Sequence, residues 1–181
     1  MQRGKGAHVI KANPFRLNLG CGPHYAAGWV NIDRYRAEEV PDGRRVDLVC
    51  DVLKLPSADH SCSQVYMGHL IEHLSIDDEV PRVLAEIRRV LAPDGRLMVV
   101  GPDIARAEAA WPEMISAIVP GEGDDKLPAG IPHKWAPTGL TALTACRAVF
   151  PKATEIPVAE VGREWPIVDR VGWQFAIDCP A

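Results

Sequence analysis

The sequence predicts a single three-layer α/β sandwich whose sheet is mostly parallel. Through the first hundred residues, strand-like apolar runs alternate with helical or turn segments, the pattern of a parallel sheet covered by its crossovers. Two more strand-like runs follow one another near the C-terminus and indicate an antiparallel pair at an edge of the sheet. The length of 181 residues suits one domain. We therefore expect one domain over 1–181, with an N-terminal extension at 1–14 and a loop-rich insertion at 102–137.

The composition is that of an ordinary globular protein, with 47% hydrophobic and 24% charged residues. The formal net charge of −4 provides no overall attraction to nucleic-acid phosphates or anionic membranes, so we expect no nucleic-acid partner. We find no apolar run long enough for a signal-peptide core or a membrane span. The five cysteines are odd in number and lack a C-x-x-C pair, which argues against a disulfide framework and favours a reducing, cytoplasmic location.

Seven strands are expected, each a short run rich in apolar or β-branched side chains. Five precede Gly101, at residues 16–19, 29–32, 46–50, 63–67 and 96–100. Beyond Gly101, prolines interrupt the pattern, and we expect a short helix followed by a loop. The chain then resumes with a helix over 138–149, capped by Thr138, and two strands at 154–161 and 171–178.

The clearest helix spans residues 77–91, where apolar side chains recur at three- and four-residue spacings and build one stripe. Ser75 with Asp78 resembles a capping box at its start. Pro81 lies near the first turn, where its missing N–H does least harm. The run Pro93-Asp-Gly95 ends the helix and turns the chain into the fifth strand.

The first functional signal is a strand that runs directly into a glycine turn, in the segment Phe15-Arg-Leu-Asn-Leu-Gly-Cys-Gly-Pro23. Gly20 and Gly22 allow backbone conformations closed to other residues and let a ligand approach the main chain closely. Ligands of open α/β sheets bind at the carboxyl ends of strands, which is where these glycines fall. A tight turn with only a structural role could also contain these glycines.

Two acids follow the next two strands. Asp33 ends the run Trp29-Val-Asn-Ile-Asp33, where a carboxylate can accept hydrogen bonds from both ribose hydroxyls of a nucleoside. Asp51 precedes Val52 and Leu53, which combines a polar group with apolar side chains suited to an adenine ring. Either acid alone is also typical of a cap or turn. Three consecutive strands that end in Gly-Cys-Gly, Asp and Asp-Val-Leu are more specific than any one of them.

Over residues 15–103 the sequence resembles the class I S-adenosylmethionine-dependent methyltransferases, especially the small-molecule branch called type 11. The resemblance extends through Leu55-Pro56 and the runs 65–73 and 86–97, which look like the family's fourth strand, its following helix and the turn into the fifth strand. It implies a Rossmann-like, seven-strand sheet and S-adenosylmethionine as the cofactor.

In that family the glycine loop lies under the methionine part of the cofactor, the acid after the second strand holds the ribose, and the segment after the third strand holds the adenine. For this sequence the resemblance implies the following cofactor-binding residues: Asn18, Gly20, Cys21, Gly22, Asp33, Asp51, Val52, Leu53, Gly68 and His69.

The sequence departs from the family pattern around its first crossover. Asn18 stands where the family usually has an acid, and His24 stands where a third glycine is common. Only about a dozen residues separate the first two strands, which is near the minimum for a parallel crossover. We therefore expect the first crossover helix to be short or absent.

The run His69-Leu-Ile-Glu-His73 has two competing interpretations. It spells H-x-x-E-H, the inverted zinc-protease signature, which needs both histidines on one helix and a distant third ligand. Because His69 follows a strand-like run and Gly68, we expect no metal and instead place both imidazoles beside the transferable methyl group. There His69 or His73 could remove a proton from the acceptor or could only shape the pocket. His133, in the insertion, could reach the same substrate side or be structural.

The sequence thus favours an S-adenosylmethionine-dependent methyltransferase that acts on a small-molecule, glycan or lipid acceptor. One alternative is a binding or structural protein that keeps the fold without turnover, which the changes at Asn18 and His24 would suit. A second is a nicotinamide-dependent oxidoreductase, but a full G-x-G-x-x-G is lacking because position 25 is Tyr. The oligomeric state and the acceptor atom stay open.

Overall fold

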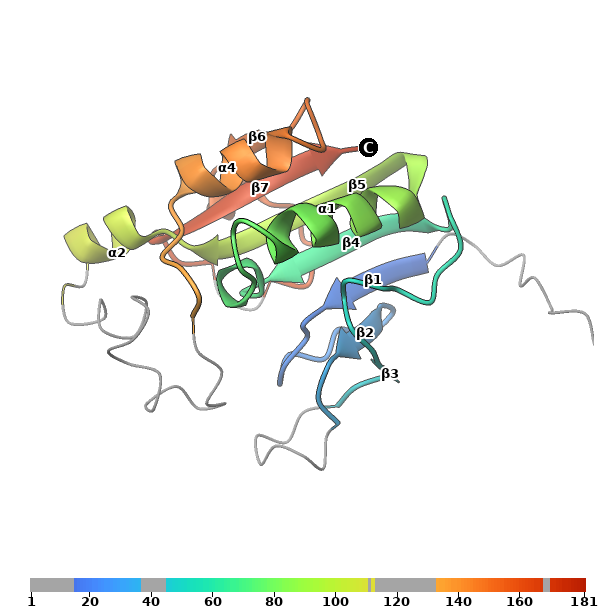
Figure 1. Ribbon diagram of the computed structural model, residues 1–181. Coiled ribbons are helices and arrows are strands. Elements are labelled where there is room, and N and C mark those ends of the chain that lie inside the picture. The colour runs from blue at the N-terminus through green and yellow to red at the C-terminus, as the bar shows by residue number, and fades with distance from the viewer. Residues whose placement is uncertain (1–14, 37–44, 111, 113–132, 168–169) are drawn as a thin grey trace, which may run out of the picture.

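The computed structural model describes residues 15–36, 45–110, 112, 133–167 and 170–181. Seven strands form one sheet in the order β3-β2-β1-β4-β5-β7-β6 (Figure 1). The extension at 1–14 and most of the insertion at 102–137 lie outside the described residues. In chain order the strands are β1 (Phe15–Leu19), β2 (Val30–Asp33), β3 (Leu48–Val49), β4 (Cys62–Gly68), β5 (Leu91–Pro102), β6 (Thr154–Ile156) and β7 (Gln174–Pro180).

The predicted strand directions are confirmed. Strands β3, β2, β1, β4 and β5 are parallel, and β7 runs antiparallel to both β5 and β6. Because the chain leaves β1 toward β2 and β3 and then crosses back to β4, the order reverses between β1 and β4. This reversal is the topological switch point at which open α/β sheets bind their ligands.

Helix α1 (Glu79–Val90) buries the apolar stripe that its sequence predicts, with Val80, Val83 and Ile87 all fully buried. The expected capping box with Asp78 is wrong, because Asp78 makes no side-chain cap hydrogen bond. Ser75 pairs with Glu79 instead: the Glu79 N–H donates to Ser75 Oγ (3.1 Å), and the Ser75 N–H donates to Glu79 Oε2 (2.8 Å). This reciprocal pair closes one residue later than expected, across the turn at 76–78 that precedes the helix.

The turn predicted at 93–95 lies inside β5 as a bulge. Leu91 pairs with Cys62 and Arg96 pairs with Gln64, so the four residues between Leu91 and Arg96 face a single residue of β4.

The last strands are shorter or shifted relative to the prediction. Strand β6 stops at Ile156, before Pro157, which has no N–H for a ladder, and the 3₁₀ turn η5 (Val158–Glu160) follows.

Two further helices flank the C-terminal half. Helix α2 (Ile104–Ala110) is the short helix expected after Gly101. Helix α4 (Gly139–Arg147) begins at the predicted cap, where Thr138 Oγ1 accepts from the Thr141 N–H in a reciprocal capping box. Helices α1 and α4 lie side by side on one face of the sheet (Figure 1).

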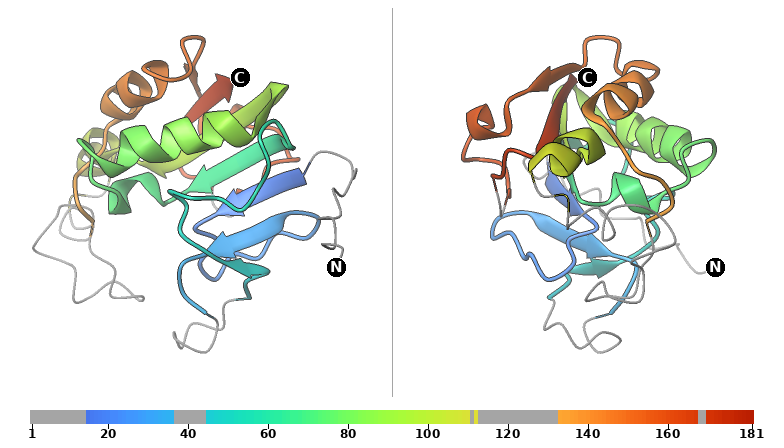
Figure 2. Two further views of the ribbon diagram at one scale, coloured as in Figure 1. Left: turned by 45° about the vertical axis from the view of Figure 1, so that its right-hand side comes forward. Right: turned by 90° about the vertical axis from the view of Figure 1, so that its left-hand side faces the viewer.

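The opposite face of the sheet is covered differently. There Trp29, Trp165 and Val158 pack on Tyr66 and Met98 in a second apolar cluster. Figure 2 shows α1 and α4 on one side of the sheet and the η5 segment on the other. In the described part of the chain, this third layer consists of loops and a 3₁₀ turn rather than long helices.

The connection from β1 to β2 contains no helix among its described residues 20–29, as expected. A buried amide stabilises this loop instead. Asn31 Oδ1 accepts from Asn18 Nδ2 (2.9 Å) and from the Ala26 N–H (2.8 Å), while Asn31 Nδ2 donates to Asp47 Oδ2 (2.9 Å). Partial burial raises the pKa of Asp47, but the hydrogen bonds from Asn31 and Tyr25 outweigh it and leave this pKa lowered.

The same network accounts for an amide rather than an acid at position 18. Asn18 Nδ2 donates both to Asn31 Oδ1 and to the His24 carbonyl (3.1 Å), and an ionised carboxylate has no hydrogen to donate to either. An amide at position 18 therefore matches a loop that is held by polar contacts rather than by a crossover helix.

All five cysteines are free, as the sequence indicated, and four of them are buried. In the described ranges, none of the helices has the length and apolar character needed to cross a membrane.

Candidate functional site

A pocket opens where the carboxyl ends of β1, β2 and β4 meet. It has a volume of about 210 Å³, and its wall combines the glycine turn after β1, the acid that ends β2 and the segment after β3. The parallel strand order brings these segments together, because their carboxyl ends all lie at one edge of the sheet. The predicted site residues that line the pocket are Gly20, Gly22, Asp33, Asp51, Val52, Leu53, His69 and His73.

The remaining predicted residues line a second, smaller pocket of about 90 Å³. Asn18, Cys21 and Gly68 belong to its wall, and Gly20 and His69 line both pockets. The two spaces therefore adjoin across the ends of β1 and β4. The structure thus brings together every residue that the sequence singled out for the cofactor.

The glycine turn adopts the left-handed backbone that its sequence suggested, with φ of 62° at Gly20 and 49° at Gly22. The Cys21 N–H donates to the Ile32 carbonyl (3.0 Å) and ties the turn to β2. A Cβ on Gly20 would lie 2.9 Å from Leu70 Cδ1, whereas a Cβ on Gly22 would meet no atom within 4 Å. Gly22 therefore borders open space, and Gly20 is packed.

This difference predicts unequal stabilities for two alanine variants. Gly22→Ala should lower the free energy of unfolding by about 1 kcal/mol, because only left-handed strain is added. Gly20→Ala should lower it by about 2 kcal/mol or more, because the contact with Leu70 adds to the same strain. Denaturant unfolding measures both, with Gly172→Ala as the control, since a Cβ there meets nothing within 4 Å. Equal losses at positions 20 and 22 would contradict the packing described.

Asp33 is buried and holds the turn with its carboxylate. Its Oδ2 accepts from the Gly22 N–H (2.9 Å), and its Oδ1 accepts from the Tyr35 N–H (3.1 Å). A carboxylate is a strong hydrogen-bond acceptor, and Asp33 belongs to the wall of the larger pocket, where a ligand with hydroxyl donors could reach it.

The segment after β3 forms another part of the wall. Asp51 Oδ1 accepts from the Leu53 N–H (2.9 Å), which folds the segment into a tight turn. Val52 is buried against the core and Leu53 is half-buried. An exposed carboxylate beside two apolar side chains can contact both the edge and the face of a flat heterocyclic ring.

His69 lies directly after β4 in a strained conformation, with φ of 50°. Its Nδ1 lies 3.3 Å from Glu72 Oε1, and its Nε2 lies 2.7 Å from Gln174 Nε2. Because the Gln174 amide nitrogen can only donate, Nε2 accepts, and Nδ1 carries the proton that points to Glu72. The imidazole is therefore oriented from both sides.

The H-x-x-E-H run does not form the inverted-protease geometry. The 3₁₀ turn η2 covers only Ile71–His73, so His69 and His73 do not share a helix. His73 instead approaches His133, with ring centroids 4.7 Å apart. Burial raises the pKa of Glu72, but the hydrogen bond from His69 and the two nearby imidazoles outweigh it, so this pKa is lowered.

Several residues of the site were not identified from the sequence. Leu70 packs over Gly20, and Arg34 and Tyr35 line the larger pocket. Gln174 reaches His69 from the start of β7, across 105 positions of sequence. In the sequence, Gln174 is marked only as a polar residue at the start of a buried strand, and this does not assign it to the site.

Comparisons with known proteins identify relatives of this chain. Residues 17–99 match a family model described as "Methyltransferase domain". The chain is 36% identical over 90 residues to the "Probable tRNA methyltransferase 9B" of Mus musculus, which covers 50% of this chain but 18% of that protein. It is 27% identical to the "Methyltransferase GfsG" of Streptomyces halstedii, over 82% of this chain and 66% of that one. The fold is similar to a SAM-dependent methyltransferase from Archaeoglobus fulgidus (TM-score 0.60, 12% identity, 94% and 87% coverage).

One expectation is overturned by these relatives. We excluded a nucleic-acid partner on the net charge of −4, and this exclusion is wrong, because the mouse relative is named as a tRNA methyltransferase. Net charge summed over a chain says little about the local surface that meets an acceptor.

Proposed function

We propose that the chain is a class I methyltransferase and that it transfers a methyl group from S-adenosylmethionine to a small-molecule acceptor, since residues 17–99 match a methyltransferase family model. The cofactor would occupy the two adjoining pockets at the carboxyl ends of β1, β2 and β4. The observation that carries the proposal is that the glycine turn, Asp33 and the Asp51 segment all line one pocket.

Each part of the wall complements one part of the proposed cofactor. The open side of Gly22 admits the methionine portion close to the main chain. Asp33 accepts hydrogen bonds from the ribose hydroxyls while it keeps its bonds to Gly22 and Tyr35. Asp51, Val52 and Leu53 contact the adenine. Asn18, Cys21 and Gly68, which line the smaller pocket, complete the cofactor site on the side of β4.

The chemistry asks little of the protein beyond alignment. The sulfonium of S-adenosylmethionine supplies an activated methyl carbon, so the chain contributes most by holding the acceptor in line with it. His69 and His73 are the two imidazoles that line the larger pocket. We assign His69 a positioning role, since Glu72 and Gln174 fix its ring, and it presents that ring toward the acceptor side.

Two acceptor classes have support. A small molecule such as a sugar, lipid or natural product is the acceptor class that the sequence resemblance implies, and the match to the Streptomyces methyltransferase, whose name specifies no acceptor, extends over 82% of this chain. The match to the mouse protein has higher identity but covers 50% of this chain and 18% of that protein, so RNA is the second candidate. The alternative of a fold that binds the cofactor without turnover predicts transfer to neither class.

The proposal is tested by following the methyl group. The protein is incubated with methyl-labelled S-adenosylmethionine and either total RNA or a small-molecule extract, and the label is counted in each fraction. We expect label in the small-molecule fraction, lost when S-adenosylhomocysteine is added in excess. Label in RNA would select the second candidate, and cofactor binding without label in any fraction would support the inactive alternative.

A further inference from the structure

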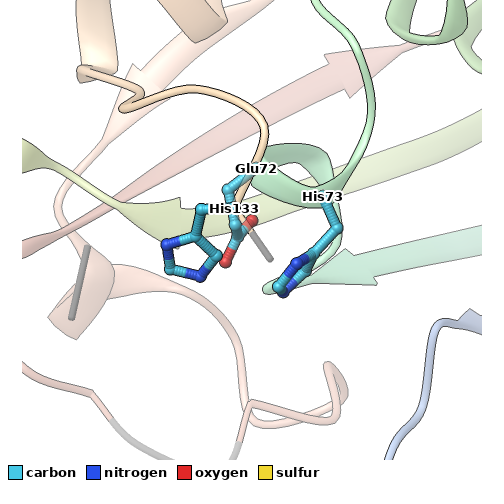
Figure 3. A group of neighbouring side chains, drawn as sticks. All are labelled: Glu72, His73 and His133. Atoms are coloured by element: carbon cyan, nitrogen blue, oxygen red, sulfur yellow. The ribbon is translucent and has the colours of Figure 1, made fainter. Parts of the chain in front are cut away.

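Three side chains with metal-binding atoms gather beside the larger pocket. Glu72 and His73 come from η2, and His133 comes from the segment before α4. One ligand atom from each residue lies within 4.8 Å of the other two. Figure 3 shows the Glu72 carboxylate drawn between the two imidazole rings. The cluster joins positions separated by about sixty residues of sequence, so its members meet only through the fold.

The segment that carries His133 is fixed to η2 by hydrogen bonds. The Lys134 N–H donates to the Glu72 carbonyl (2.8 Å), and Trp135 Nε1 donates to the Ile71 carbonyl (2.9 Å). Lys134 also forms an ion pair with Glu79 of α1. The backbone next to His133 is therefore held against the backbone of Glu72, which gives the cluster a defined geometry.

Glu72 provides a second, independent indication of a cation. Its side chain is 1% exposed, and Oε1 is taken by His69. Within the described part of the chain, the buried Oε2 has no hydrogen-bond partner. A buried carboxylate oxygen without a partner is costly and rare, and a bound cation is one way to satisfy it.

We infer that Glu72, His73 and His133 bind a divalent transition-metal ion and that zinc fits the site best. Two imidazoles and one carboxylate are a donor set that zinc accepts, and three protein ligands leave a fourth position for water or another oxygen ligand. Ligand atoms around tetrahedral zinc lie about 3.3 Å apart, so none of the three separations has to close by more than roughly 1.5 Å. This inference replaces our expectation of no metal.

The site would lie at the wall of the proposed cofactor pocket, because His73 lines that pocket as well. The inference does not depend on the proposed function, since metal binding is measured without any cofactor. If the metal site is disproved, the proposed methyltransferase function is unaffected, and the reverse also holds.

The test uses the full chain stripped of metal with a chelator. Co²⁺ is titrated while the visible absorption is recorded, and Zn²⁺ content is measured after equilibrium dialysis. We expect about one ion per chain, with absorption bands of a four- or five-coordinate Co²⁺ site. Glu72→Gln and His133→Ala should each weaken binding by at least about tenfold, because loss of even an outer partner costs that much.

The matched control is His60→Asn. His60 is an exposed imidazole outside the cluster, and asparagine tolerates its left-handed backbone (φ 56°). Thermal unfolding without metal verifies that each variant is folded. If Glu72→Gln is not folded, His133→Ala carries the test, because His133 is only partly buried. The inference is overturned if the wild type takes up no stoichiometric ion or if His133→Ala binds as tightly as His60→Asn.

Discussion

Asp33→Ala is expected to reduce the affinity for S-adenosylhomocysteine by roughly 100-fold or more. In the proposed cofactor site this carboxylate would accept from two ribose hydroxyls, and each hydrogen bond to a charged acceptor is worth about 1.5–3 kcal/mol. The effect should exceed that of any other single change in the pocket, since Asp33 also fixes Gly22 through Oδ2 (2.9 Å). Calorimetric titration measures the change directly.

The control for this variant is Asp94→Ala, which removes the same charge from the exposed bulge of β5. It should bind S-adenosylhomocysteine as the wild type does. Thermal unfolding of Asp33→Ala separates lost ligand contacts from a misfolded glycine turn. A folded Asp33→Ala whose dissociation constant stays within about threefold of the wild type would remove Asp33 from the cofactor site.

Asn31→Ala is expected to cause a large loss of stability, about 3–5 kcal/mol. Asn31 is fully buried, and its amide satisfies donors or acceptors on Asn18, Ala26, Trp29 and Asp47. Truncation leaves these groups without partners in the interior. The melting temperature should fall by roughly 10 °C, since 1 kcal/mol shifts a domain of this size by about 2–4 °C.

Arg82→Ala is the control variant against which the stability loss of Asn31→Ala is compared. Arg82 forms an exposed i,i+4 ion pair with Asp78 (3.3 Å), and such pairs contribute about 0.3–0.5 kcal/mol. If Asn31→Ala were no more destabilising than Arg82→Ala, the loop between β1 and β2 would have to be held by other contacts.

Much of the site was predictable because its signals are local. A glycine turn after an apolar run, and acids directly after the next two runs, describe the carboxyl ends of strands without knowledge of the fold. Their convergence follows from the parallel order, which the alternation of strands and helices indicates. The missing first crossover helix was also predictable, since the connection is too short to contain one.

The remaining features depend on contacts between distant positions. Nothing near Gln174 indicates that it meets His69, and nothing near His133 indicates Glu72. The purpose of Asn18 emerges only when Asn31 and the His24 carbonyl lie within reach of its amide. The prediction of the cap of α1 was wrong for a local reason. Ser75 pairs with Glu79, four residues later, whereas the capping-box pattern assumes a spacing of three residues.

The most direct test of the proposed cofactor site is calorimetric titration of the wild-type chain with S-adenosylhomocysteine, S-adenosylmethionine and NAD. We expect both sulfur ligands to bind at one site per chain with micromolar dissociation constants, about −8 kcal/mol, and NAD not to bind. No binding of either sulfur ligand to the folded protein would contradict a cofactor site at the carboxyl ends of β1, β2 and β4.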